Sequence, residues 1–329
     1  MATIGQNYLD LADLYKQREG GKVTAKIIEM LSQSNPILQD MVAIMCNDGT
    51  SHMTTSRAGY SAGTWRRLYQ GVMPTKGSTA QVRDTTGFLE RWSEVDAKLV
   101  SLAGDGAGQF LLNEASGQID AMSNDMADSL FYATSTVNPE RFTGLAPRFN
   151  SLSAENKSQI VDAGGTGNDN TSIWFVVWGE NTVHALYPNG SMAGLQRNNY
   201  GEETKTFADG SVMRVYRERY CWDIGLTVRD YRYVARVCNI DVSDMMAGSV
   251  ALDKLMVKAY YRLKQRKVSG GKLVIYCNTA VKAALHDLAA SKANVNLYLK
   301  NFEGEEIVTF LGTPIHEVDA LINAEARVV

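Results

Sequence analysis

The sequence predicts an α+β fold in which most strands are antiparallel. Residues 211–242 alternate apolar and polar side chains, which is typical of two long antiparallel strands, and we expect them to join near Asp223–Gly225. Apolar side chains at residues 112–133 recur every three or four positions, which predicts one long helix. The sequence shows no run of alternating strands and helices, the pattern that would predict a parallel sheet.

Composition narrows the function classes. The 329 residues allow two domains, or one domain with a large excursion. With 33 Lys and Arg against 36 Asp and Glu, the net charge of -3 predicts no bulk attraction to nucleic acid or to an anionic membrane. The longest apolar runs, such as Ile173–Trp178, fall far short of the roughly 20 residues that span a bilayer. The N-terminus carries Asp10 and Asp13 and lacks the apolar core of an export signal.

Cysteine usage indicates a reducing compartment. The four cysteines are far apart and form no CxxC pair; they are Cys46, Cys221, Cys238 and Cys277. We expect free thiols in a cytoplasm, not a disulfide framework.

The N-terminal third contains one short helix and a long polar stretch. Ile27, Ile28 and Leu31 predict a helical face that ends at Asn35–Pro36, because proline cannot donate to the helix ladder. Residues 47–97 then contain two strand-like pieces, "GTWRRLYQGV" and "STAQVRDTTGFLERWSEVD", without a continuous apolar face. A segment of this length without a core is either disordered or packs against something else.

The long helix has two contrasting faces. Its apolar stripe comprises Leu112, Ala115, Ile119, Met122, Met126, Leu130 and Ala133. The other face carries Glu114, Asp120, Asp125 and Asp128, and no Lys or Arg occurs between Lys98 and Arg141. Such an acidic face is usually exposed to solvent, but it could also bind a partner that presents arginines.

The C-terminal half predicts further strands and two helices. A buried strand at Thr171–Gly179 precedes a second strand that ends in a Pro-Asn-Gly turn, where Asn189 and Gly190 are expected to supply positive φ values. Leu252, Leu255, Met256, Ala259 and Leu263 predict a helix with a basic end at Lys264–Lys267. Lys272–Cys277 predicts a strand, residues 279–291 a helix capped by Asn278, and residues 305–321 strand pieces around Gly312 and Pro314.

Two motifs raise the question of catalysis or phosphate binding. "GYSAG" matches the G-x-S-x-G nucleophile elbow and makes Ser61 a candidate nucleophile, but no apolar strand precedes it and no amphipathic helix follows. Gly104, Gly106 and Gly108 lie between a strand-like piece, Lys98–Ala103, and the long helix, in the layout that binds a pyrophosphate. Their spacing is G-x-G-x-G and no ribose-binding acid follows, which favours a hinge into the helix.

The remaining polar residues form no catalytic constellation. His52, His184, His286 and His316 lack metal-ligand spacing, so we expect no metal and no cofactor. Six arginines lie between Arg214 and Arg236, interleaved with aromatic residues, a pattern that also occurs in nucleic-acid-binding ribbons. Alternation places them on one face of the predicted ribbon, where cross-strand pairs and contact with an acidic neighbour are the favoured interpretation.

Several short segments, in the same order, resemble the major capsid proteins of tailed double-stranded DNA bacteriophages, in the branch found among short-tailed phages. The segments are "MLSQSNPILQDM", "RAGYSAGTWRRLYQGV", "TAQVRDTTGFLERWSEVD", "NPERFTGLAPRF", "VHALYPNGSMAGL" and "FLGTPIHEVDAL". The resemblance covers essentially the whole chain and implies a Hong Kong 97-type capsid fold without enzymatic activity.

The resemblance also implies a division of the chain. We expect an N-terminal arm at 1–46, an extended loop at 47–104, and the spine helix with the start of the peripheral domain at 105–160. Axial-domain parts follow at 161–205 and 269–329, and peripheral-domain strands with the basic helix lie at 206–268. Gly104, Gly106 and Gly108 would form the hinge.

Assembly is the function that the resemblance implies. Copies would form the pentamers and hexamers of an icosahedral head around double-stranded DNA, which is close but not specifically bound. The expected inter-subunit contacts are Arg57, Trp65, Arg66, Arg67, Arg83, Glu114, Asp120, Asp125, Asp128, Arg217 and Arg219. Expected partners are the portal protein and, where present, a cement protein. Because the chain begins almost at the arm and leaves no room for a large N-terminal scaffolding segment, we expect a separate scaffolding protein or none. The protein would reside in the virion, and in the host cytoplasm during assembly.

Three rival functions stay open at this point. A serine hydrolase through Ser61 requires a parallel sheet, and a nucleic-acid-binding module would use the arginine-rich ribbon. A decoration protein of the virion is usually smaller and lacks a long helix with an extended loop.

Overall fold

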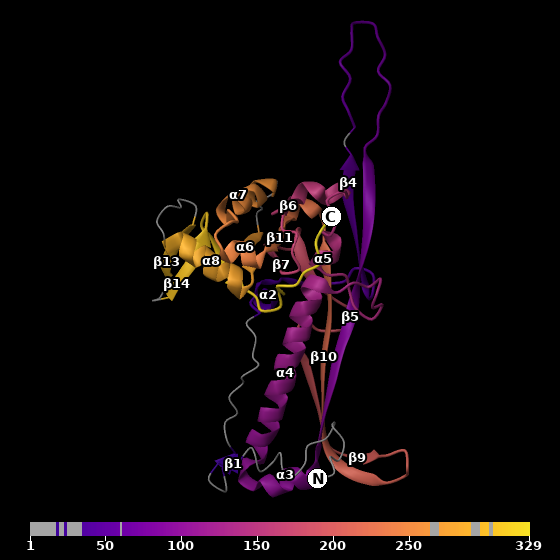
Figure 1. Cartoon of the computed structure of the whole chain (residues 1–329). Coiled ribbons are helices and arrows are strands. Elements are labelled where there is room, and N and C mark those ends of the chain that lie inside the picture. Colours follow the sequence, from indigo (N-terminus) through magenta and orange to yellow (C-terminus); the bar gives the residue numbers. More distant parts are fainter. Residues whose placement is uncertain are drawn as a thin grey trace.

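A long helix and a long hairpin extend from a strand-rich body. The computed structural model describes residues 18–19, 23–24, 35–59, 61–263, 270–290, 297–302 and 305–329. Helix α4 runs from the lower end of the molecule up to the body, and the β4–β5 hairpin rises from the body on the other side (Figure 1). Helices α6, α7 and α8 lie together on the flank away from the hairpin (Figure 1).

The described elements have the following bounds. The strands are β1 (Arg18–Glu19), β2 (Val23–Thr24), β3 (Ala43–Met45), β4 (Ser51–Gly59), β5 (Ser78–Asp96), β6 (Ile160–Asp162), β7 (Asn170–Trp178), β8 (Val183–Tyr187), β9 (Gln196–Thr206), β10 (Val212–Val228), β11 (Val234–Asp241), β12 (Lys272–Cys277), β13 (Leu297–Phe302), β14 (Glu305–Phe310) and β15 (Thr313–Glu317). The α-helices are α2 (Ile37–Asp40), α3 (Ala97–Ala103), α4 (Ala107–Tyr132), α5 (Leu145–Arg148), α6 (Val242–Met246), α7 (Leu252–Arg262) and α8 (Thr279–Ala290). Short 3-10 turns are η1 (Gly104–Gly106), η2 (Glu155–Gln159) and η3 (Tyr231–Tyr233).

Strand β7 is the centre of the body and is buried along its whole length. It pairs antiparallel with β11 and β12, and β12 pairs parallel with β15. Trp174, Val176 and Trp178 point into the core shared with α4, whereas Ile173 and Phe175 point into the core shared with α7 and α8. Both faces of the strand are covered, which accounts for the continuous apolar run from Ile173 to Trp178.

Several predicted elements of the C-terminal half are confirmed. The buried strand, the strand before the Pro-Asn-Gly turn, and "KLVIYC" are β7, β8 and β12. The amide of Val281 donates to the Asn278 side-chain oxygen at 2.9 Å, so Asn278 caps α8 as expected. Of the turn pair, only Gly190 has a positive φ, +96°; Asn189 does not, which corrects the prediction.

The long helix is confirmed, with one correction to its apolar stripe. Leu112 is 55% exposed, whereas Phe110 is completely buried against Leu99 and Val100 of α3. Leu112 follows Phe110 by two residues, which places it on roughly the opposite side of the helix. The lower end of α4 therefore packs on α3 through Phe110, and its upper end packs on the body through Met122, Met126 and Leu130.

The segment before the glycines is helical, which corrects the strand expected at Lys98–Ala103. Helix α3 begins because the Asp96 carboxylate accepts a hydrogen bond from the Lys98 amide at 2.7 Å. It ends at Gly104, whose φ of +60° is a left-handed conformation that glycine tolerates. The chain then turns through η1 into α4.

The predicted turn at Asp223–Gly225 is wrong, because β10 runs through it without interruption. Strand β10 instead pairs with β9, β5 and β8, and β11 belongs to β7. Gly225 serves a close approach of two strands: a Cβ there would lie 2.6 Å from the carbonyl oxygen of Thr85 on β5.

The polar stretch is a hairpin with a long irregular tip. "STAQVRDTTGFLERWSEVD" is β5, as predicted, and it pairs antiparallel with β4. "GTWRRLYQGV" forms no strand, which corrects that prediction; residues 61–77 connect β4 to β5 without regular structure. The expected helical face at Ile27, Ile28 and Leu31 and the basic end Lys264–Lys267 lie outside the described residues.

Gly225→Ala should destabilise the protein by about 1–3 kcal/mol, because the added methyl group meets backbone atoms that cannot rotate away. Urea unfolding of the full chain measures the change. Gly63→Ala in the hairpin tip, where a Cβ has open space, is the matched control. Equal stabilities of the two variants would contradict the close-approach role of Gly225.

Candidate assembly surfaces and the buried network behind them

The tip of the β4–β5 hairpin, residues 61–77, exposes large apolar side chains. Trp65 and Tyr69 are fully exposed, and Leu68 and Met73 are more than four-fifths exposed. The Arg66 guanidinium donates to the Gln70 carbonyl oxygen at 3.4 Å, so the described tip contacts mainly itself. An apolar patch on a projecting element is typical of an interaction site.

The tip also carries the basic residues predicted to make contacts. Arg66 and Arg67 are exposed there. Arg83 lies lower, at the hairpin root, and forms an ion pair with Asp48 at 3.0 Å. The side chain of Arg57 is outside the described part of the structure. Ser61 lies in the irregular tip just after β4, and residues 61–77 contain no helix of the kind that a nucleophile elbow needs after its serine.

The acidic residues of α4 lie far from the tip in the same chain (Figure 1). Asp125 and Asp128 are exposed, and Glu114 and Asp120 are half-buried. Partial burial and the neighbouring Asp125 raise the pKa of Asp128, with Arg141 opposing this. A strongly acidic surface of this kind favours a basic partner.

A pocket of about 190 Å³ separates α4 from the root of the hairpin. Phe88, Met126 and Phe142 supply apolar walls, and Asp125 and Glu140 supply acidic ones. Phe88 is 57% exposed, so the apolar surface continues outside the pocket.

Arg217 and Arg219 lie on the ribbon formed by β5, β10 and β9, not on the predicted hairpin. Arg217 pairs with Glu94 at 2.8 Å and with Glu203 at 2.9 Å, and Arg219 pairs with Glu90. Both guanidinium groups also lie over the ring of Trp92. Their charges are matched within the chain, so the ribbon offers no surplus of positive charge to nucleic acid.

The three glycines surround the corner between α3 and α4. Gly104 ends α3, Gly106 precedes α4, and Gly108 lies in the first turn of α4. A Cβ at Gly104 or Gly108 would contact nothing within 4 Å, so the outer side of the corner is open, while α3 and α4 pack on each other through Phe110.

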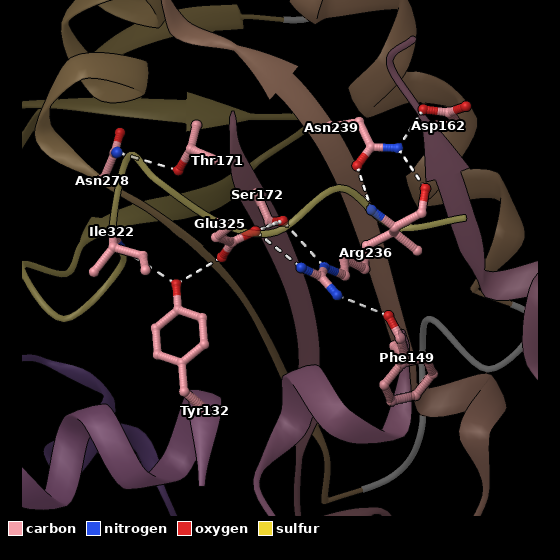
Figure 2. A network of polar contacts seen from close by, with 11 residues as sticks. Tyr132, Phe149, Asp162, Thr171, Ser172, Arg236, Asn239, Asn278, Ile322 and Glu325 are labelled. Carbon is pink, nitrogen blue, oxygen red and sulfur yellow. Dashed lines mark hydrogen bonds and ion pairs between the residues drawn. The ribbon is translucent and has the colours of Figure 1, made fainter. Parts of the chain in front are cut away.

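A buried ion pair, which the sequence patterns did not reveal, ties the C-terminal segment to the body (Figure 2). Arg236 on β11 and Glu325 meet at 2.8 Å, and each side chain is only 4% exposed. Arg236 also donates to the Phe149 carbonyl oxygen at 2.8 Å and to the Ser172 hydroxyl at 3.0 Å. In the sequence, the only indication of this ion pair is an arginine within the largely apolar segment "VARVCNID".

The same network fixes the upper end of α4. The hydroxyl of Tyr132 donates to Glu325 at 2.6 Å and accepts a hydrogen bond from the Ile322 amide at 3.2 Å (Figure 2). Asn239 exchanges two hydrogen bonds with the backbone of Val328, at 2.8 and 2.9 Å. The last residues of the chain thereby connect the helix to the central sheet.

A second polar centre fixes the start of the described body. The Asp40 carboxylate accepts hydrogen bonds from Lys272 at 2.6 Å and Tyr276 at 2.9 Å, and His316 lies 2.7 Å from it. Burial alone would raise the pKa of Asp40, but the hydrogen bonds from His316, Lys272 and Tyr276 and the charge of His316 lower it to about 2.

The four cysteines are buried and free, as predicted. Among the described residues, no helix has the length and apolar character needed to cross a membrane.

The chain resembles structures of phage shells. It is 36% identical to a chain in the near-atomic structure of bacteriophage Epsilon15, with a TM-score of 0.78, covering 100% of this chain and 99% of that one. A chain of the bacteriophage JBD30 capsid has the same fold at 10% identity, with a TM-score of 0.53, covering 89% of this chain and 93% of that one. No curated protein sequence matches the chain.

The projecting hairpin, the long helix and the central sheet define a shell-forming subunit with the Hong Kong 97-type capsid fold. The family model of the major capsid protein GP7 matches residues 18–329, and the chain belongs to that family. Its role is therefore structural: it forms the icosahedral shell of a phage virion.

Arg236→Met should lower the free energy of unfolding by about 3–5 kcal/mol, because Glu325 would be left charged and buried without its partner. The double variant Arg236→Met/Glu325→Gln should lose less than the single variant does. Urea unfolding followed by fluorescence gives both values.

The matched control is Arg214→Met, which removes an exposed ion pair with Glu202 and should cost no more than about 1 kcal/mol. If Arg236→Met were as mild as Arg214→Met, the buried pair would not hold the C-terminal segment.

Asp40 should make the protein less stable in acid. Its pKa of about 2 in the folded protein lies below its ordinary value of 3.8, so its stabilisation is present above about pH 4 and is lost as pH falls towards 2. The difference corresponds to about 2 kcal/mol. Asp40→Asn should flatten the stability profile in this window, whereas exposed Asp105→Asn should not; a profile that Asp40→Asn leaves unchanged would contradict this assignment.

Proposed function

We propose that copies of the chain join as pentamers and hexamers, with the hairpin tip of one copy lying on the α4 surface of a neighbour. The observation that carries this proposal is the exposure of Trp65, Leu68 and Tyr69 on an element that projects from the body. In water this apolar surface costs free energy, at about 25 cal/mol per Å², which a second copy removes by covering it.

Charge complementarity supports the choice of a second copy as the partner. Residues 61–77 contain Arg66, Arg67 and Lys76 and no acid. The proposed recipient carries Glu114, Asp120, Asp125 and Asp128 on one helix. Exposed ion pairs contribute at most about 1 kcal/mol each, so the charges set orientation while apolar burial supplies most of the affinity.

Many weak contacts of this kind suffice for a closed shell. Each copy both offers a tip and receives one, so contacts reinforce one another around a ring. The corner at Gly104, Gly106 and Gly108 lets α3 and the ribbon change angle against α4, which supports one chain in both pentamers and hexamers. We assign residues 1–46 to an arm, 47–104 to the extended loop, 105–160 to the spine region, 206–268 to the peripheral domain, and 161–205 with 269–329 to the axial domain.

The same proposal extends to other components of the particle. A portal protein replaces one pentamer, and scaffolding or cement proteins act from the inner or outer surface. Packaged double-stranded DNA is a neighbour without specific contacts, consistent with the net charge of -3 and with the internally paired arginines. Catalysis is not part of this function, and a fluorophosphonate probe should leave Ser61 unlabelled.

Arg66→Glu/Arg67→Glu should abolish or strongly reduce assembly, because the tip would then repel the acidic helix face. Sedimentation velocity and electron microscopy of the purified chain measure the fraction in shells. Asp120→Lys/Asp125→Lys should have the same effect, and combining the four changes should restore part of the assembly.

Two control variants separate this effect from misfolding. Ser61→Ala changes the same tip without changing its charge, and Lys254→Glu alters an exposed charge on α7. Both should assemble normally, and all variants should keep the circular dichroism of the parent. Normal assembly of either charge-reversed pair would contradict the tip-to-helix contact.

A further inference from the structure

Two histidines are buried edge to edge at the root of the hairpin. His52 on β4 is 5% exposed and His184 on β8 is fully buried. Their ring centroids lie 5.6 Å apart with the ring planes at 89°. Within the described part of the chain, none of the four ring nitrogens makes a hydrogen bond of good geometry, although the backbone of Gly179 lies near enough to His184 to favour its protonated form. Buried polar atoms without hydrogen-bond partners are uncommon and lower the stability of the folded state, so this pair calls for an explanation.

The pair lies where the hairpin leaves the body. His52 is opposite Asp84 in the β4–β5 ladder, and His184 is opposite Thr227 in the β8–β10 ladder. Strand β5 pairs with β10 only up to Thr86, and from Thr85 onward towards the tip it pairs with β4. The two rings therefore connect the first strand of the hairpin to the central body.

Charged groups around the pair oppose its protonation. Arg229, which follows β10, acts on both rings, and Asp84 on β5 acts in the opposite sense on His52. The Asp84 carboxylate is already occupied: it accepts hydrogen bonds from Arg148 on α5, at 2.8 Å, and from the Thr227 hydroxyl. A proton on either ring would thus add a buried positive charge with little to neutralise it.

We propose that His52 and His184 form an acid-sensitive latch, which holds the hairpin root against β8 when neutral and releases it when protonated. At neutral pH the two uncharged rings pack together and the Asp84–Arg148 pair completes the root. In acid, the rings gain protons only by moving into water, and this separates β4 from β8. The hairpin then gains freedom to change its angle to the body.

The lowered pKa values of the two histidines determine how opening of the hairpin root depends on pH. Burial, Arg229 and His52 lower the pKa of His184 to about 4, and burial and Arg229 also lower the pKa of His52. The open state has histidines near their usual pKa of about 6.5 and takes up protons first as pH falls. Opening therefore becomes about tenfold more favourable per pH unit and per histidine below about pH 6.5, and for His184 this continues down to about pH 4.

Hydrogen–deuterium exchange of the full chain between pH 7 and pH 5 tests the latch, with rates corrected for the intrinsic pH dependence of exchange. Peptides covering residues 51–54 and 84–87 should lose at least about fivefold of their protection between pH 6.5 and 5.5, because a histidine in the open state is already about half protonated at pH 6.5. The internal reference is β12 (Lys272–Cys277), which should keep its protection in the same sample.

Variants identify the groups responsible. His184→Phe and His52→Phe should each flatten the pH dependence at the root, because an apolar ring of similar shape does not titrate. His286→Phe, on the exposed face of α8, should leave the parental profile unchanged.

Two results would overturn the proposal. In the first, the corrected exchange protection of the root peptides in the parent chain stays constant over this pH range, or it falls in parallel with that of β12. The other is a His184→Phe chain that folds and keeps the full pH dependence. The first comparison needs no variant, so it decides even if a substituted chain does not fold.

Discussion

The exchange of partners along β5 is the constraint on which the rest of the structure depends. Over one half of its length β5 pairs with β10 and belongs to the ribbon; over the other half it pairs with β4 and belongs to the projecting hairpin. The crossing lies at Asp84–Gly87, where Arg148, Thr227 and the buried histidines surround the strand. Gly225 allows β10 to approach closely at this point. A hairpin without a core of its own thus receives its direction from a root in which the side chains of His52, Asp84 and His184 are buried.

The remaining polar interactions keep that root in a fixed relation to the long helix. Arg236 and Glu325 connect β11 to the C-terminal segment, and Tyr132 connects that segment to the end of α4. Asp40 performs the same task for the N-terminal side of the body, through β12 and β15. These groups are buried and matched, whereas the aromatic residues of the hairpin tip are fully exposed. The contrast indicates a rigid subunit that reserves one element for contact with another copy.

Elements with a strong local pattern could be predicted, and those decided by long-range pairing could not. The apolar run of β7, the periodicity of α4 and the cap at Asn278 were recognised because each depends on neighbours in sequence. The turn expected at Asp223–Gly225 was wrong because Gly225 serves a distant strand, and a glycine in the sequence does not show which of the two roles it has. The ion pairs of Arg217 and Arg219 within the chain could not be predicted, because their partners, Glu94, Glu203 and Glu90, are separated from them in sequence. The Arg236–Glu325 pair and the meeting of His52 with His184 have no local signature at all.

Membership of the major capsid protein GP7 family accounts for a chain whose most exposed apolar residues lie on its most projecting element. The central claim is that a second copy covers this tip. Cryo-electron microscopy of shells assembled from the purified chain tests it most directly. We expect ordered density for Trp65, Leu68 and Tyr69 against α4 of an adjacent copy. Tips that project into solvent in a closed shell, or that fold back on their own chain, would contradict it.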